Sequence, residues 1–294
     1  MDYGRPVEFG YFLTPDADYP EVLRRAQLCD ALGMDFLGVQ DHPYQRRFLD
    51  TWTLLSSLAP QTSRIRLLPD VINLPLRPPA VLAKAAASLD IISGGRLELG
   101  LGAGAFWEGI GAMGGPVRAP GEAVDALEEA IQVLRLLWSG ERGLRFEGQH
   151  YQLNGAHSGP LPAHPLGVWV GAYGPRMLEL TGRLGDGWVP SSSYAKPARL
   201  GEMQQRIDDA ALQAGRDPAS IRRAYNVMGQ IGGTAGEPFH GPPQQWVDEL
   251  TGLALEAGMD TFIIGLPEPP GQQIEQFMAE IAPLVRENVE AQRQ

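Results

Sequence analysis

Strand-like and helix-like segments alternate along the whole chain, and this alternation constrains the fold more than any other feature. Short apolar runs are each followed by a stretch whose apolar residues recur three and four apart. Such runs predict strands at residues 7–12, 35–40, 65–72, 96–101, 168–172, 187–190, 222–231 and 261–265. Strands that alternate with helices pair in parallel. Eight such units in 294 residues predict an α/β fold, a single (β/α)8 TIM barrel over residues 1–294 rather than a doubly wound sheet.

Two stretches depart from the repeat. Residues 144–153 (LRFEGQHYQL) predict a small β-hairpin that turns at Glu147 and Gly148, an insertion outside the barrel. Residues 106–116 (FWEGIGAMGGP) are rich in glycine, and we expect no helix directly after the fourth strand. The expected fold is therefore a barrel with insertions.

Charge and cysteine content exclude several classes of function. A net charge of -11 argues against nucleic acid or an acidic membrane surface as the main partner. The one cysteine, Cys29, lies in a helical pattern and predicts a buried thiol rather than a disulfide or a nucleophile. His157 and His164 lack helical spacing, so no metal site is expected. No signal-like start and no long apolar run occurs, which predicts a soluble cytoplasmic protein.

The active site of such a barrel lies where the strands end, so polar residues at these ends are the candidates. Among the histidines of the chain, His42 alone is expected there. A neutral imidazole near pH 7 suits a proton donor or acceptor, and a structural hydrogen bond is the alternative. Its neighbour Asp41 could orient the ring or bond the backbone. The next two strand ends contribute Asp70, Val71 and Asn73, and then Gly102, Ala103 and Glu108.

Glycine-rich turns suggest where a ligand approaches the backbone. The alternate glycines of residues 100–104 let backbone N–H groups come close to a flat or phosphorylated ligand. The fifth strand ends in Gly171, Ala172, Tyr173, Gly174 and Pro175, and a helix follows. Because the first N–H groups of a helix have no internal partner, this turn is a candidate anion site. The alternative is a tight turn that needs glycine for its geometry.

Several of these stretches together resemble the luciferase-like flavin and deazaflavin oxidoreductases. They are DFLGVQDHP, NLPLRPPAVLAKAAASLDIISGGRLELGLGAG, EAVDALEEAIQVLRLLWSG, FEGQHYQL and VGAYGPRMLELTGRLGDGWVPS. The resemblance runs from about Val7 to Ser193, and the last third of the chain matches mainly in architecture. It implies a (β/α)8 barrel with insertions, as the alternation does.

The resemblance also implies roles for individual residues. His42 matches a histidine beside the redox carbon of the deazaflavin in members that use coenzyme F420, and Glu108 resembles an acid of sugar-phosphate dehydrogenases. Asp70 and Val71 match the position of a non-prolyl cis peptide behind the cofactor ring. The turn at residues 171–175 matches the loop that holds the cofactor phosphate. Apolar neighbours of Glu108, such as Phe106, favour a small neutral or apolar substrate over a phosphorylated one.

The implied function is therefore redox chemistry at a bound flavin-type ring. The pair Asp41 and His42 favours F420 and hydride transfer, as in a reductase or dehydrogenase. Monooxygenation with reduced FMN, supplied by a separate flavin reductase, is the alternative, and a homodimer is expected from the resemblance. A non-catalytic flavin-binding barrel is the alternative of another class, and cofactor titration followed by turnover distinguishes it. A metal-dependent hydrolase is disfavoured, because no cluster of His and Asp stands at the strand ends.

Overall fold

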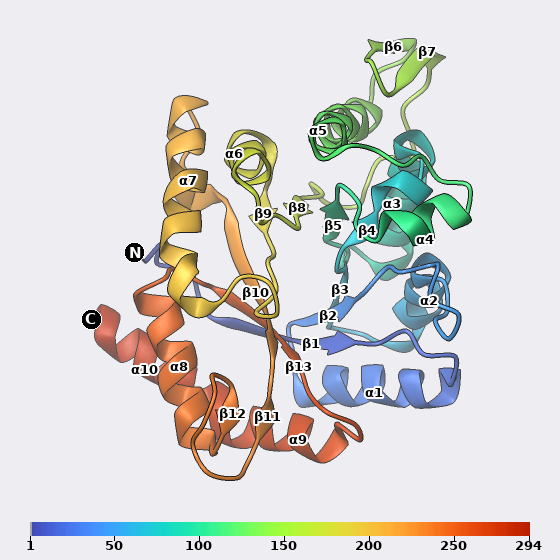
Figure 1. Ribbon diagram of the computed structural model, residues 1–294. Coiled ribbons are helices and arrows are strands. Elements are labelled where there is room, and N and C mark those ends of the chain that lie inside the picture. The colour runs from blue at the N-terminus through green and yellow to red at the C-terminus, as the bar shows by residue number, and fades with distance from the viewer. Residues whose placement is uncertain (1) are drawn as a thin grey trace.

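Nine parallel strands form one sheet in the computed structural model, which describes residues 2–294 (Figure 1). Two of them, β3 (Arg66–Pro69) and β4 (Ile72–Asn73), are successive segments of one barrel strand. A bridge between Leu67 and Leu97 joins the two ends of the sheet, which closes around eight strand positions. The predicted TIM barrel is thus confirmed. The other barrel strands are β1 (Glu8–Leu13), β2 (Phe36–Val39), β5 (Leu99–Gly102), β8 (Val168–Val170), β9 (Gly187–Trp188), β10 (Arg222–Met228) and β13 (Thr261–Gly265).

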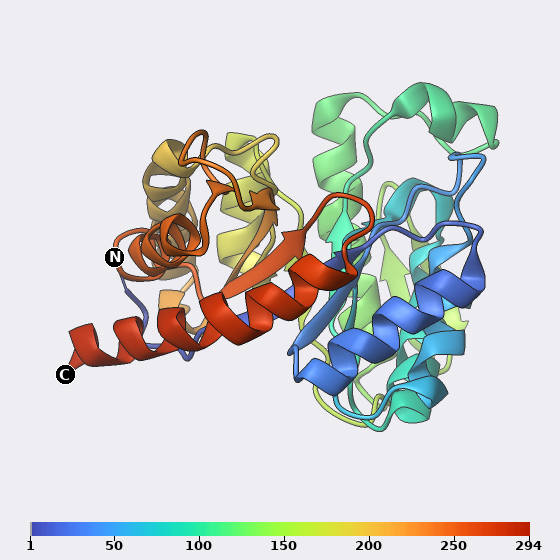
Figure 2. The same cartoon turned by 90° about the horizontal axis from the view of Figure 1, so that it is seen from below.

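Helices lie outside the strands, and local sequence signals set their ends (Figures 1 and 2). The first begins where the Asp18 side chain accepts from the N–H of Glu21 and ends at Gly33, whose φ is 78°. Gly94, with φ 73°, ends the third helix in the same way. The helices are α1 (Tyr19–Leu32), α2 (Thr51–Leu58), α3 (Pro79–Ser93), α5 (Pro120–Leu137), α6 (Pro175–Leu184), α7 (Leu200–Gln213), α8 (Pro243–Leu255), α9 (Gly271–Gln276) and α10 (Ala282–Arg293). No helix within residues 2–294 has the length and apolar character needed to cross a membrane.

Three predicted segments differ from the structure. The expected strand 65–72 is interrupted by a cis peptide bond between Asp70 and Val71. The expected strand 222–231 ends at Met228, and Gln230–Ile231 (β11) pairs instead with His240–Gly241 (β12). The expectation of no helix after the fourth strand is wrong, because Trp107–Ala112 form α4. Its glycines disfavour a helix, but the burial of Ile110 outweighs that preference.

The predicted hairpin is confirmed as an antiparallel pair, β6 (Leu144–Glu147) and β7 (Gln152–Ala156). Figure 1 shows it beyond α5, away from the barrel strands. The Glu129 carboxylate of α5 accepts hydrogen bonds from the backbone N–H groups of Gln149, His150 and Tyr151. One acid thereby holds the turn of the insertion against the neighbouring helix.

Large side chains fill the barrel interior below the carboxyl ends of the strands. A buried cluster of inward residues contains Phe36, Leu68, Trp169, Val189, Ala224 and Ile263. The rings of Phe36 and Trp169 meet edge to face, with centroids 5.3 Å apart. A filled interior leaves no room for a ligand, which must lie above it at the carboxyl ends of the strands. Because side chains alternate along a strand, the inward positions above Leu68 and Ala224 are Asp70 and Asn226.

Candidate active site

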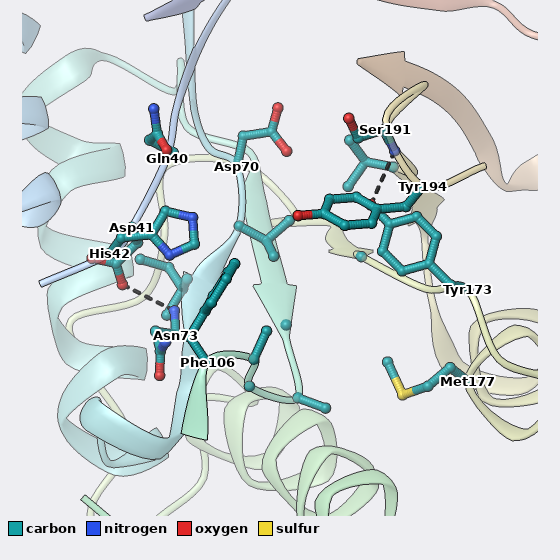
Figure 3. A pocket seen from close by; sticks show the side chains of 18 of the residues that line it. Gln40, Asp41, His42, Asp70, Asn73, Phe106, Tyr173, Met177, Ser191 and Tyr194 are labelled. Carbon is teal, nitrogen blue, oxygen red and sulfur yellow. Dashed lines mark hydrogen bonds between the residues drawn. The ribbon is translucent and has the colours of Figure 1, made fainter. Parts of the chain in front are cut away.

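A cavity of about 750 Å³ opens at the carboxyl ends of the strands. Its walls come from distant parts of the chain, as Figure 3 shows for His42, Asp70, Phe106, Met177 and Tyr194. The loops after β2, β5 and β8 all contribute, as the sequence predicted from the strand ends. Most of the exposed wall is apolar or aromatic, with Phe106 57% and Tyr194 65% exposed.

The imidazole of His42 points into this cavity (Figure 3). Its Nδ1 lies 2.6 Å from the hydroxyl oxygen of Tyr44, and its ring meets the edge of Phe106 with centroids 5.5 Å apart. Burial lowers the pKa of His42, and the charge of Asp41 opposes this only in part. The imidazole is therefore neutral at pH 7 and can accept a proton.

Other residues of the chain donate hydrogen bonds to the carboxylate of Asp41. Its carboxylate accepts from the backbone N–H of Asn73 at 2.9 Å and from two guanidinium nitrogens of Arg77 at 2.8 and 2.9 Å. Arg77 also pairs with Asp50, the residue that caps α2. Of the two roles considered from the sequence, Asp41 thus bonds the backbone. It fixes the loop that carries His42, and its contact with a cofactor stays a prediction.

Val71 forms a ridge that the neighbouring glycines accommodate. A Cβ at Gly102 would lie 2.7 Å from a methyl group of Val71, and one at Gly171 would lie 3.1 Å from it. At Gly100 a Cβ would meet the carbonyl oxygen of Pro69 at 2.1 Å. These glycines therefore make room for the protein's own atoms. The expectation that they bring backbone N–H groups close to a ligand is wrong. Val71, Gly102 and Ala103 nevertheless line the cavity.

The turn after β8 divides into lining and supporting residues. Gly171, Tyr173 and Gly174 line the cavity, whereas Ala172 is buried and its carbonyl accepts from the indole N–H of Trp188. The Tyr173 hydroxyl accepts from the N–H of Ser191 at 3.0 Å.

Gly174 is the N-cap of α6 and Pro175 its first residue. No side chain caps this helix, so the N–H groups of its first turn are open to an anion. Pro175 has no N–H of its own to offer.

Glu108 lies apart from this arrangement. It is exposed in the first turn of α4 and does not line the cavity, whereas its neighbours Phe106 and Trp107 do. The structure therefore does not bring Glu108 and His42 into one site. Phe106 itself has φ 57°, a conformation that bulky residues rarely adopt, and it turns its ring toward His42.

Two residues that shape the site were not predicted from the sequence. Tyr44 holds the His42 ring, and Asn226 donates from its side chain to Asp70 at 3.0 Å. Asn226 carries a readable signal, since it is a polar residue within a buried strand, at an inward position two residues after Ala224. Tyr44 has no such signal, because loop conformation alone brings it to the imidazole. Among residues 2–294 no group of three or more His, Cys, Asp or Glu side chains could hold a metal ion.

The sequence of this chain is similar to those of known enzymes. The chain is 32% identical to a 5,10-methylenetetrahydromethanopterin reductase of Archaeoglobus fulgidus, over 71% of this chain and 60% of the relative. It is 30% identical to an F420-dependent glucose-6-phosphate dehydrogenase of Kineococcus radiotolerans, over 76% and 68%. The chain thus spans about two thirds or less of the length of these relatives.

Solved structures share the fold. An F420-dependent secondary alcohol dehydrogenase, solved with an F420–acetone adduct, superposes with a TM-score of 0.84 at 19% identity, over 95% of this chain and 99% of that one. A monooxygenase from Streptomyces bottropensis gives 0.80 at 20% identity, over 94% and 99%. Residues 7–237 match the family described as luciferase-like monooxygenase. The chain therefore belongs to the luciferase-like monooxygenase family.

Proposed function

We propose that this chain is a flavin-type oxidoreductase that uses coenzyme F420 to move a hydride to or from a small neutral or apolar organic substrate. One observation carries the proposal. A single cavity at the barrel mouth combines a neutral imidazole, an uncapped helix N-terminus and apolar walls. Two of the relatives named above support F420, because their names state that they depend on it.

The residues present fit such a cofactor. The volume of about 750 Å³ lies in the range of cofactor sites. Val71 and Gly102 would back the ring, and the first turn of α6 after Gly174 would bind a phosphate. When bound, F420 supplies hydride transfer, while the protein supplies position and a proton partner.

His42 is the proton partner in this proposal. Burial keeps its imidazole neutral, Tyr44 fixes the ring through Nδ1, and the Asp41–Arg77 pair fixes the loop. A neutral imidazole held in this way can take a proton when a neighbouring group loses one, and return it later.

The walls favour an uncharged substrate. Among residues 2–294, no lysine or arginine lines the cavity, so a phosphorylated substrate would lack a cationic partner. Phe106 and Tyr194 instead offer apolar surface. A ketone or secondary alcohol with an apolar body suits this combination.

A second candidate is monooxygenation with reduced FMN, which a separate flavin reductase would supply. The monooxygenases among the structural relatives favour it. A homodimer, expected from the family, is part of either proposal, and light scattering of the purified protein tests it.

Anaerobic titration distinguishes the candidates. The purified protein is titrated with F420, FMN and reduced FMN, and binding is followed by fluorescence. We expect tight binding of F420. Secondary alcohols added to bound F420 should reduce the deazaflavin, and ketones added to bound reduced F420 should oxidise it, and absorbance follows both changes. Preferential binding of reduced FMN and oxygen-dependent product would instead support the monooxygenase. Binding without turnover of any substrate would support the non-catalytic barrel.

A further inference from the structure

Asp70 places a carboxyl group in the floor of the cavity with one oxygen unused. The residue is 7% exposed and lines the cavity at the inward position above Leu68. Its Oδ1 accepts from the side-chain N–H of Asn226 at 3.0 Å. Its Oδ2 is buried and has no hydrogen-bond partner within residues 2–294, and the same holds for Oδ1 of Asn226. Figure 3 shows the carboxyl group between His42 on one side and Tyr194 on the other.

No cation within residues 2–294 balances this carboxyl group. A Cβ built at Gly38 of β2 would lie 3.1 Å from Oδ2 and 3.0 Å from a methyl of Ile263 of β13, so this oxygen lies close to the backbone of Gly38. Burial raises the pKa of Asp70 to about 7, and the bond from Asn226 opposes this only weakly. The other titratable residues that line the cavity are Asp41, His42, Tyr44, Tyr173 and Tyr194. Of these, the one acid, Asp41, is already paired with Arg77.

We propose that Asp70 lies beneath the bound flavin-type cofactor as a neutral carboxylic acid and takes up its proton when the cofactor binds. A ligand that covers the floor removes the remaining water, which disfavours a carboxylate with no cation beside it. Because Asn226 donates to Oδ1, the proton belongs on Oδ2. This assignment rests on the proposed function, since it concerns the same cavity and cofactor.

The assignment couples binding to proton uptake. Above the pKa of the free protein, Asp70 is ionised and must take a proton from solvent before the cofactor binds. The affinity of the wild-type protein then falls about tenfold for each pH unit above 7. Asp70→Asn presents an N–H donor at every pH and does not titrate, so its affinity stays level over the same range.

Calorimetry tests this without relying on activity. F420 and FMN are titrated at pH 8 into the wild-type protein, Asp70→Asn and His42→Gln, in two buffers of different ionisation enthalpy. The difference between buffers gives the number of protons taken up. We expect close to one proton for the wild-type protein and for His42→Gln, and none for Asp70→Asn. His42→Gln is the matched control, because the His42 imidazole is another side chain that lines the cavity and can take up a proton.

Infrared difference spectra provide a second measurement on the wild-type protein itself. Aspartate labelled with carbon-13 should show the C=O stretch of a protonated acid when the cofactor binds at pH 8, whether or not the variant folds. Equal uptake in Asp70→Asn, uptake lost in His42→Gln, or no such band overturns the assignment. A wild-type protein that binds neither cofactor contradicts the proposed function as well. If a cofactor binds but Asp70 takes up no proton, this inference is wrong, whereas the proposed function is unaffected.

Discussion

At the amino-terminal end of the barrel, Asp30 accepts hydrogen bonds from the backbone N–H groups of Ser63, Arg64 and Ile65, whereas at the mouth Asp70 accepts one, from Asn226. Burial alone would raise the pKa of Asp30, but these N–H donors outweigh it and lower the pKa to about 2. At Asp70 burial prevails, and the pKa rises to about 7. The two acids thus differ because Asp30 has donors for both of its oxygens, whereas Asp70 is more deeply buried and has a donor for one oxygen only.

The contrast extends beyond these two acids. At the amino-terminal end, Arg66 pairs with Glu8, Arg286 with Asp35 and Arg223 with Asp208. At the mouth, buried side-chain oxygens of Asp70, Asn73 and Asn226 remain without donors within residues 2–294. Buried side-chain atoms without a hydrogen-bond partner also occur at the amino-terminal end, on Glu8, Arg222 and Arg223. The two ends differ instead in charge balance, because the acids paired there have arginine partners, whereas Asp70 has none within residues 2–294. We therefore expect Asp30 to matter for stability alone, whereas residues at the mouth matter for function and, at Asp70, also for the pH dependence of stability.

His42→Ala should have the largest effect, and on function alone. General acid–base help contributes about 10²–10⁴-fold in rate, so turnover should fall by that factor, with cofactor affinity changed much less. Steady-state kinetics and fluorescence titration measure the two quantities. If turnover stays within about twofold, His42 has a structural role, and the proton partner lies elsewhere in the cavity.

Asp30→Ala should act on stability alone. Removing the carboxylate leaves the N–H groups of Ser63, Arg64 and Ile65 without acceptors, at a cost of about 2–4 kcal/mol in the free energy of unfolding. The pKa of Asp30 is lower in the folded state, so its contribution is present above the unfolded value near 4 and is lost as pH falls toward 2. Urea unfolding at pH 7 and pH 3 measures this. Equal losses at both pH values would show that the charge of Asp30 does not matter.

The effect of Asp70→Asn on stability should depend on pH in the opposite sense to that of Asp30→Ala. The pKa of Asp70 is higher in the folded state, so the wild-type protein loses stability as pH rises from about 4 to 7. The variant lacks this loss and should be more stable than the wild-type protein at pH 8, by about 1–3 kcal/mol. At pH 4 the two should unfold at similar urea concentrations. If the variant is less stable than the wild-type protein at pH 8, then a partner within the folded protein balances the charge of the Asp70 carboxylate.

The fold was predictable from the sequence because it depends on patterns that repeat. Alternating strand and helix signals gave the barrel, and the turn at Glu147 and Gly148 gave the hairpin. The errors occur where packing overrides local preference. The glycine-rich helix Trp107–Ala112 is one case. The third strand breaks at the cis peptide bond between Asp70 and Val71, which is the position that the family resemblance implied.

The candidate site was predictable only where it follows from the strand ends. His42, Asp70, Asn73 and the turn at Gly174 line the cavity as expected, since parallel strands bring their ends together. The use of each polar atom could not be predicted. The sequence places Asp41 next to His42, but only the conformation of the loop shows that Arg77 occupies its carboxylate. Glu108 likewise follows the fourth strand, yet α4 turns it away from the cavity.

Gly174→Val should have the smallest effect and should again separate function from stability. Gly174 has φ −82° and ψ 157°, which a β-branched residue adopts readily, and a Cβ there meets no atom within 4 Å. The barrel should therefore keep its stability. The added methyl groups would stand beside the open N–H groups of α6 and hinder a phosphate, which these groups would stabilise by about 1–2 kcal/mol. That corresponds to about tenfold weaker cofactor binding.

Gly271→Val is the matched control, because its Cβ also meets no atom within 4 Å and it begins α9, outside the cavity. Affinity equal in both variants would show that the cofactor phosphate does not bind at α6.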